Sequence, residues 1–197
     1  MPGYDIKHEQ VAVHGVDDLH IRSLLDRQQF SDPSGEAAAM GISSAMWPLF
    51  GLLWPSGLQL ADQMASRQVR SGERILEIGC GLALASLVSH RRGGEVTASD
   101  CHPLAEAFIG ENLRLNDLPP MHYRHGPWDG AASPQGFESR SGVDGRFDLI
   151  IGSDILYERD DSGVLAAFIE RQAHSSACVL IVDSDRSNRA AFNRRMD

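Results

Sequence analysis

The sequence predicts one α/β fold, in which a doubly wound, mostly parallel sheet carries helices on both faces. Short apolar runs alternate with amphipathic segments from residue 74 onward, and this alternation is typical of parallel sheets. The first of these runs ends in Gly79-Cys80-Gly81, and a glycine turn between a strand and a helix is typical of Rossmann-like folds. A length of 197 residues with 42% hydrophobic residues suits a single domain with a substantial core.

The amino-terminal part has a weaker pattern. We expect residues 1–46 to form an extension that packs on a domain spanning residues 47–197. Within the extension, two short apolar runs at 11–13 and 20–25 predict a small hairpin. A helix is then expected over residues 58–69, where apolar residues recur at helical spacing.

The remaining elements alternate regularly. Five strands are expected, at residues 74–78, 95–99, 121–125, 147–151 and 178–182. Helices are expected at residues 82–90, 104–115, 163–172 and 188–196, and a loop rich in Gly, Pro and Ser at 126–145.

Composition excludes several classes of function. There are 18 Lys and Arg against 27 Asp and Glu, a net charge of −9, which argues against a nucleic-acid-binding surface and against docking on anionic membranes. The sequence shows no signal core, and its apolar runs are far shorter than the ~20 residues of a membrane span. The three cysteines form no CxxC pair and have no His at zinc spacing. We therefore expect no metal site, free thiols and a cytoplasmic location.

The glycine turn indicates a nucleotide-type cofactor. Asp100 follows it by about 20 residues, at the end of the next strand, where a carboxylate can bind ribose hydroxyls. A dinucleotide site would require glycine where Leu84 stands, and Glu77 is poorly placed beside a pyrophosphate. S-adenosylmethionine (SAM) has an ammonium and a sulfonium and no phosphate, so Glu77 favours SAM over NAD. The structural alternative is that the glycines only form a tight turn and Asp100 only caps the next helix.

A second group of candidates follows the fourth expected strand. Ser153, Asp154 and Tyr157 come after the apolar run at 147–151, at the carboxyl edge where open α/β sheets bind ligands. We expect Asp154 and Tyr157 to lie close together. The alternative is that Asp154 is a helix N-cap and Tyr157 is a packing residue.

Four segments together resemble class I SAM-dependent methyltransferases, and specifically the seven-strand protein lysine methyltransferases of family sixteen. ILEIGCGLALASL (75–87) resembles motif I, and TASDCHPL (97–104) resembles the acidic loop that follows it. FDLIIGSDILYE (147–158) contains the Asp-x-x-Tyr pattern, and LWPSGLQLA (53–61) resembles the Trp-Pro segment ahead of motif I. The similarity covers roughly residues 44–186.

The resemblance implies an enzyme that methylates a lysine side chain of a protein partner. A small-molecule N-methyltransferase and a non-catalytic SAM-binding module remain as alternatives. The implied catalytic residues are Asp154, which would orient the acceptor amine, and Tyr157, which would wall its pocket. The implied cofactor-binding residues are Trp54 and Glu77 at the methionine end, Gly79 and Gly81 through their backbone, Asp100 at the ribose, Cys101, His102 and Trp128 around the adenine, and Ser153.

The chain departs from the family pattern in two places. Ala83 stands where the family commonly has a third glycine; alanine is small, so we expect cofactor binding to survive. The family sheet ends in an antiparallel hairpin after its fifth strand, but only 14 residues follow Asp183. We therefore expect this hairpin to be missing or truncated here.

Overall fold

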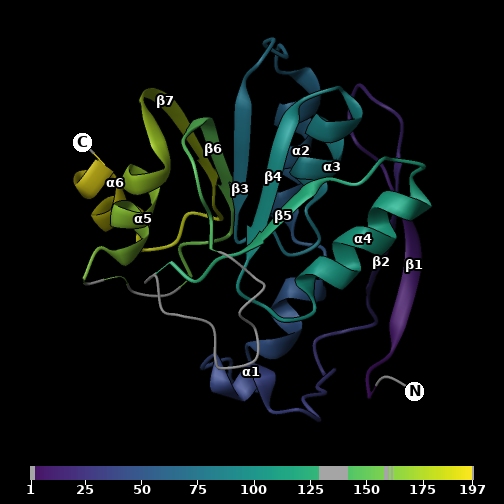
Figure 1. Ribbon diagram of the computed structural model, residues 1–197. Coiled ribbons are helices and arrows are strands. Elements are labelled where there is room, and N and C mark those ends of the chain that lie inside the picture. The colour runs from purple at the N-terminus through teal and green to yellow at the C-terminus, as the bar shows by residue number, and fades with distance from the viewer. Residues whose placement is uncertain (1–2, 129–141, 158–159, 161, 197) are drawn as a thin grey trace.

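A five-stranded parallel sheet forms the centre of the protein in a computed structural model that describes residues 3–128, 142–157, 160 and 162–196. The strand order is β5-β4-β3-β6-β7 (Figure 1). The strands are β3 (Arg74–Ile78), β4 (Glu95–Asp100), β5 (His122–His125), β6 (Phe147–Ser153) and β7 (Ala173–Val182).

The strand order reverses direction at the middle of the sheet. From β3 the chain moves outward through β4 and β5, then returns to β6 on the other side of β3 and continues to β7. Parallel pairing aligns Ile75 of β3 with Val96 of β4 and with Leu149 of β6. In open α/β sheets, this switch point at the carboxyl ends of the strands is where ligands bind.

Helices cover both faces of the sheet (Figure 1). The longer helices are α2 (Pro55–Ser66), α3 (Leu84–Arg91), α4 (Ala105–Leu115), α5 (Val164–Gln172) and α6 (Arg189–Met196). A short helix α1 (Glu36–Ala39) and a 3₁₀ turn η1 (Trp47–Gly51) precede them.

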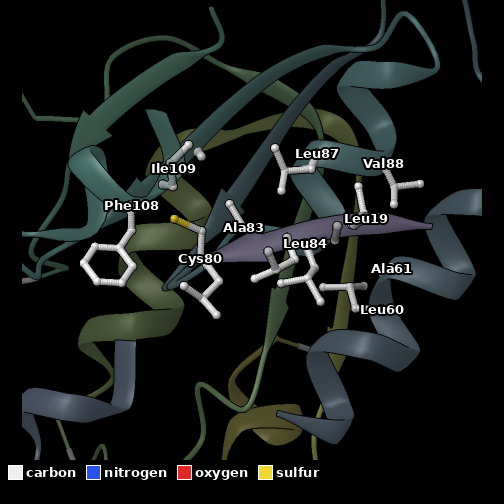
Figure 2. Close-up of a cluster of buried hydrophobic side chains, with 14 of the residues drawn as sticks. Leu19, Leu60, Ala61, Cys80, Ala83, Leu84, Leu87, Val88, Phe108 and Ile109 are labelled. Atoms are coloured by element: carbon white, nitrogen blue, oxygen red, sulfur yellow. The ribbon is translucent and has the colours of Figure 1, made fainter. Parts of the chain in front are cut away.

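The alternation of side chains along each strand builds two hydrophobic cores. Ile75 and Leu149 face one core, which α2, α3 and α4 complete; Leu76 and Ile150 face the other, which α5 completes. Figure 2 shows part of the first core, to which α2 contributes Leu60, α3 contributes Leu87 and α4 contributes Phe108. The central strands are therefore covered on both faces, as a parallel sheet requires.

The amino-terminal segment forms an antiparallel hairpin of β1 (Ile6–Val11) and β2 (Leu19–Leu24). Leu19 and Ile21 of β2 are fully buried in the first core. Asn112 of α4 and Asn116, the C-cap residue of this helix, also bind the backbone of β2. The side-chain oxygen of Asn112 accepts the N–H of Arg22 at 2.7 Å, and that of Asn116 accepts the N–H of His20 at 2.9 Å.

The observed architecture confirms the predicted fold class. Some boundaries differ: β1 shares only Val11 with the predicted run at 11–13, and β7 begins at Ala173, directly after α5, rather than at residue 178. Part of the expected loop at 126–145 lies outside the described residues. Within the described chain, no strand pairs with the outer edge of β7. No helix in the described ranges is long and apolar enough to span a membrane.

Candidate active site

Glu77 lies inside β3 and is buried at the start of the glycine turn. Its Oε2 accepts the backbone N–H of Ser86, in the first turn of α3, at 2.8 Å. Burial raises the pKa of the Glu77 carboxyl from its usual value to about 7. The carboxylate therefore stands at the amino end of a helix, at a high desolvation cost that a nearby cation would offset.

The two glycines of the turn have left-handed backbones, with φ of 58° at Gly79 and 51° at Gly81. A Cβ atom on Gly79 would lie 2.8 Å from Ile155 Cγ2, and one on Gly81 would lie 2.7 Å from the carbonyl oxygen of Phe50. Both positions therefore need glycine for conformation and for space. Ala83 is also left-handed, with φ of 58°.

Asp100 joins the glycine turn to the segment after β4. Its Oδ2 accepts the N–H of Gly81 at 2.8 Å, and its Oδ1 accepts the N–H of His102 at 2.8 Å. Burial raises the pKa of this carboxyl as well. Each carboxylate oxygen can accept a further hydrogen bond. Asp100 can therefore hold the loop in place and also accept a hydrogen bond from a ribose hydroxyl.

The two residues after Asp100 have different surroundings. Cys101 is exposed. His102 is buried, and one face of its ring stacks on Phe50 with the centroids 3.7 Å apart. Burial lowers the pKa of His102 to about 3, so the ring is neutral. The Phe50 contact covers one face of the imidazole, so that face is closed to the adenine that His102 is predicted to flank.

Trp128 and the turn after β6 adjoin the glycine turn. A Cβ on Gly79 would lie 3.5 Å from Trp128 Cζ2 and 2.8 Å from Ile155 Cγ2. Trp128 is held through its carbonyl oxygen, which accepts from Arg171 Nη2 at 3.0 Å. The structure thus brings the segment that carries Asp154 and Tyr157 to the same edge of the sheet as the glycine turn.

Trp54 and Ser153 lie around the start of α2. Trp54 is the N-cap residue of α2, its indole N–H donates to the Leu49 carbonyl at 2.9 Å, and the Arg27 guanidinium lies 4.8 Å from the centre of its ring. Ser153 ends β6, and its hydroxyl lies 3.5 Å from the position that a Cβ on Gly57 would take. Trp54 is half-buried, with a ring face that already contacts a cation.

Asp154 is held from several sides in a left-handed conformation, with φ of 53°. Its N–H donates to the Val182 carbonyl at 2.9 Å, and Arg186 Nη1 lies 2.5 Å from its Oδ1. Residues in sparsely populated backbone regions cluster at functional sites. Tyr157 follows with 46% of its surface exposed, so it is open to a molecule arriving from solvent.

The sequence prediction missed Arg186 and Asp183, which form the ion pair network around Asp154. The available signal was an Asp directly after an apolar strand, with an Arg three residues later. In the described part of the chain, no group of three or more His, Cys, Asp or Glu side chains could hold a metal ion. None of the three cysteines is in a disulfide.

Comparisons with known proteins place the chain in a family. The family described as "Lysine methyltransferase" matches residues 41–196. The electron transfer flavoprotein beta subunit lysine methyltransferase of Xenopus laevis is 27% identical over 71% of this chain and 54% of that protein. EEF1A lysine methyltransferase 3 of Mus musculus is 26% identical over 73% of this chain and 60% of that protein. The chain therefore spans little more than half the length of these relatives.

Solved structures support the fold alone, because their sequences are distant. The 16S rRNA N2 G1207 methyltransferase RsmC of T. thermophilus, in complex with AdoMet and guanosine, superposes with a TM-score of 0.61 at 14% identity. The match covers 96% of this chain and 45% of that one. With the family pattern matched over most of its length, the chain belongs to the lysine methyltransferase family of class I SAM-dependent methyltransferases.

Proposed function

We propose that this chain transfers a methyl group from SAM to the side-chain amine of a protein lysine. The observation that carries the proposal is the pair of buried carboxylates beside one glycine turn: Asp100 accepts the N–H of Gly81, and Glu77 accepts the N–H of Ser86 in the helix that follows. Two buried acids disfavour a pyrophosphate and favour a cationic ligand. SAM is such a ligand, and the family in which the chain falls supports its use.

In this proposal, each residue around the turn binds a different part of the cofactor. Glu77 receives the ammonium of the methionine end, with Trp54 beside it. Gly79 and Gly81 present their backbone, and Asp100 binds the ribose. Cys101, His102 and Trp128 bound the adenine; for His102, the stacking on Phe50 restricts the contact to the edge or the other face of the ring. Ser153 lies where the cofactor side and the acceptor side meet.

Asp154 and Tyr157 form the acceptor side. Bound SAM supplies an electrophilic methyl group: the amine nitrogen bonds to the methyl carbon as the carbon–sulfur bond breaks, leaving S-adenosylhomocysteine (SAH). The amine must first be neutral, and at pH 7 only a fraction of order 10⁻³ of free lysine is so. Asp154 orients the amine and accepts a hydrogen bond from it, and the Tyr157 ring stabilises the cation that forms. Alignment of the amine supplies most of the acceleration.

A protein acceptor and a cytoplasmic location complete the proposal. Relatives whose names state protein lysine acceptors support a protein partner with an accessible lysine. The absence of disulfides between the three cysteines supports a reducing compartment.

The test has a binding step and a transfer step. Calorimetry should show that SAM binds the wild type and that Asp100→Ala weakens this binding at least tenfold. Labelled SAM with a cell lysate should label protein bands, and mass spectrometry should place the methyl group on lysine. Methylated arginine or labelled small molecules would reject the lysine acceptor, and SAM binding without any transfer would reject catalysis.

A matched pair of variants tests the role of Asp154. Asp154→Asn should reduce the transfer rate at least tenfold while changing SAM affinity less than threefold. Asp185→Asn is the control, because Asp185 is also left-handed, with φ of 61°, but its side chain is 76% exposed. Equal losses of rate and SAM affinity in Asp154→Asn would refute the acceptor role.

A further inference from the structure

The segment after β7 folds back over the turn after β6. The N–H of Asp154 donates to the Val182 carbonyl at 2.9 Å, and the side-chain amide of Asn188 donates to the Leu156 carbonyl at 2.9 Å. These bonds join residues about thirty positions apart in the chain, so the position of Asp154 depends on the segment 183–188.

Arg186 connects two carboxylates in this segment. Its Nη1 lies 2.5 Å from Asp154 Oδ1 and 2.8 Å from Asp183 Oδ2. The other oxygen of Asp183 accepts the backbone N–H of Arg186 at 3.0 Å. The side chains of Asp154 and Asp183 are 12% and 3% exposed. One guanidinium nitrogen therefore bridges two acids that are largely withdrawn from water.

The cluster of Asp154, Asp183 and Arg186 carries a net negative charge that one further cation would neutralise. Two carboxylates and one guanidinium carry a formal charge of −1. Among the described residues, both side-chain donors to the Asp154 carboxylate, Arg186 and the Ser184 hydroxyl, meet its Oδ1. The second oxygen can then face an ammonium. Without the guanidinium, the Asp154 and Asp183 carboxylates would repel each other.

We propose that Arg186 is a positioning residue that fixes Asp154 through Oδ1 and so aims its other carboxylate oxygen at the acceptor amine. This inference rests on the proposed function, because it takes Asp154 as the group that meets the amine. The opposite possibility is that Arg186 occupies the place of that amine and must leave before it binds. The two possibilities predict changes of opposite sign when Arg186 is removed.

The experiment compares two ligands that need no acceptor. SAH lacks the transferred methyl group, whereas sinefungin carries an amine in its place. The ratio of their dissociation constants therefore reports how well the Asp154 carboxylate binds a cation at this position. The wild type should prefer sinefungin over SAH in calorimetry. Arg186→Ala should reduce this preference at least threefold while changing the SAH dissociation constant less than threefold. If Arg186→Ala does not fold, Arg186→Gln replaces it.

Control and rescue variants separate positioning from general stability. Arg189 forms an exposed ion pair with Asp185, with its Nη2 at 3.0 Å from Oδ1, and Arg189→Ala should leave the ligand preference unchanged. Arg186→Lys should keep part of the preference because a cation remains between the two acids. About 20 mM guanidinium chloride should partly restore it in Arg186→Ala, whereas a merely unstable variant should not respond.

Three outcomes would overturn the inference: an unchanged preference in Arg186→Ala, a stronger preference there, or a wild type that binds both ligands equally. The stronger preference would show that Arg186 competes with the amine. The lysine proposal is tested separately: it fails if the lysate assay yields no methylated lysine. That result would not affect the comparison of sinefungin with SAH.

Discussion

At the scale of single residues, Glu77 shows how a functional group opposes the stability of its own fold. Burial raises the pKa of its carboxyl from 4.5 to about 7. Between these values the folded chain holds a proton that the unfolded chain releases, so the stability from this group is complete below about pH 4.5 and is lost as the pH rises through 7. At higher pH the folded chain carries a buried charge that a bound cation would stabilise.

This conflict predicts the behaviour of Glu77→Gln. The amide keeps an oxygen for the Ser86 N–H but cannot ionise. Between pH 5 and pH 8 the wild type should therefore lose stability that Glu77→Gln keeps. The free energy of unfolding of the variant, relative to that of the wild type, should rise by on the order of 2–3 kcal/mol over this range. SAM affinity should fall at both values. Urea unfolding and calorimetry measure the two effects. Glu170→Gln, an exposed change on α5, should show no such growth, and a difference that shrinks with pH would contradict the role of burial.

The glycine turn gives a second prediction at this scale. Gly81→Ala places a methyl group 2.7 Å from the Phe50 carbonyl oxygen, at φ of 51°. The left-handed conformation alone costs about 1–2 kcal/mol, so we expect lower stability and at least a tenfold loss of SAM affinity.

Gly110 is the matched control for this change. It lies in α4 with open space around it, so Gly110→Ala should stabilise the chain by roughly 0.5–1 kcal/mol. Thermal unfolding with and without SAM compares the two variants. Unchanged SAM binding in Gly81→Ala would show that the cofactor does not depend on this turn.

The sequence allowed prediction of the candidates around the glycine turn because their arrangement depends on local chain geometry. Glu77, Gly79 and Gly81 lie in one stretch of five residues in a single strand–turn–helix unit, and Asp100 ends the adjacent strand. Arg186 could not be predicted in the same way. Its contact with Asp154 spans 32 residues and exists only because β7 returns beside β6. The stacking of His102 on Phe50 likewise depends on tertiary packing.

At the scale of elements, strands with strong apolar runs were predictable and polar ones were not. The boundaries of β3 match the prediction, because its apolar side chains are buried on both faces. By contrast, β1 has the sequence IKHEQV and buries only Val11. The first residues of β7, including His174, Ser175 and Ser176, are exposed. β1 is a strand because β2 pairs with it along its whole length, whereas residues 174–177 of β7 lie at a shift in the register with β6. Composition carries little signal for either arrangement.

The attachment of the hairpin to α4 gives a prediction for these elements. Asn112 is fully buried, and its side chain accepts the N–H of Arg22. Asn112→Ala leaves this N–H without its partner, which should lower the free energy of unfolding by about 1–3 kcal/mol. Arg114→Ala, which removes an exposed ion pair on the same helix, should change it by less than about 0.5 kcal/mol. Urea unfolding compares the two, and equal effects would show that the asparagine does not hold the hairpin.

At the scale of the whole molecule, the candidate residues gather at one edge of the sheet, although they come from separate parts of the chain. Glu77 lies one residue before the end of β3, Asp100 ends β4 and Asp154 follows β6, and parallel pairing places these carboxyl ends together. The hairpin instead packs against α4 through β2 and the first core. Ligand binding should therefore change the dynamics of one region and leave the other unchanged.

Hydrogen exchange with and without SAH tests this division. The N–H groups of Gly81, Ser86 and His102 donate to the two buried carboxylates, so a ligand that holds those carboxylates should slow their exchange at least threefold. The amides of β1 and β2 should exchange at an unchanged rate, and these strands serve as the internal control. Uniform slowing across the chain would indicate only a global gain in stability. Slowing confined to β1 and β2 would place the ligand away from the glycine turn and would reject the assignment of Glu77 and Asp100 to the cofactor.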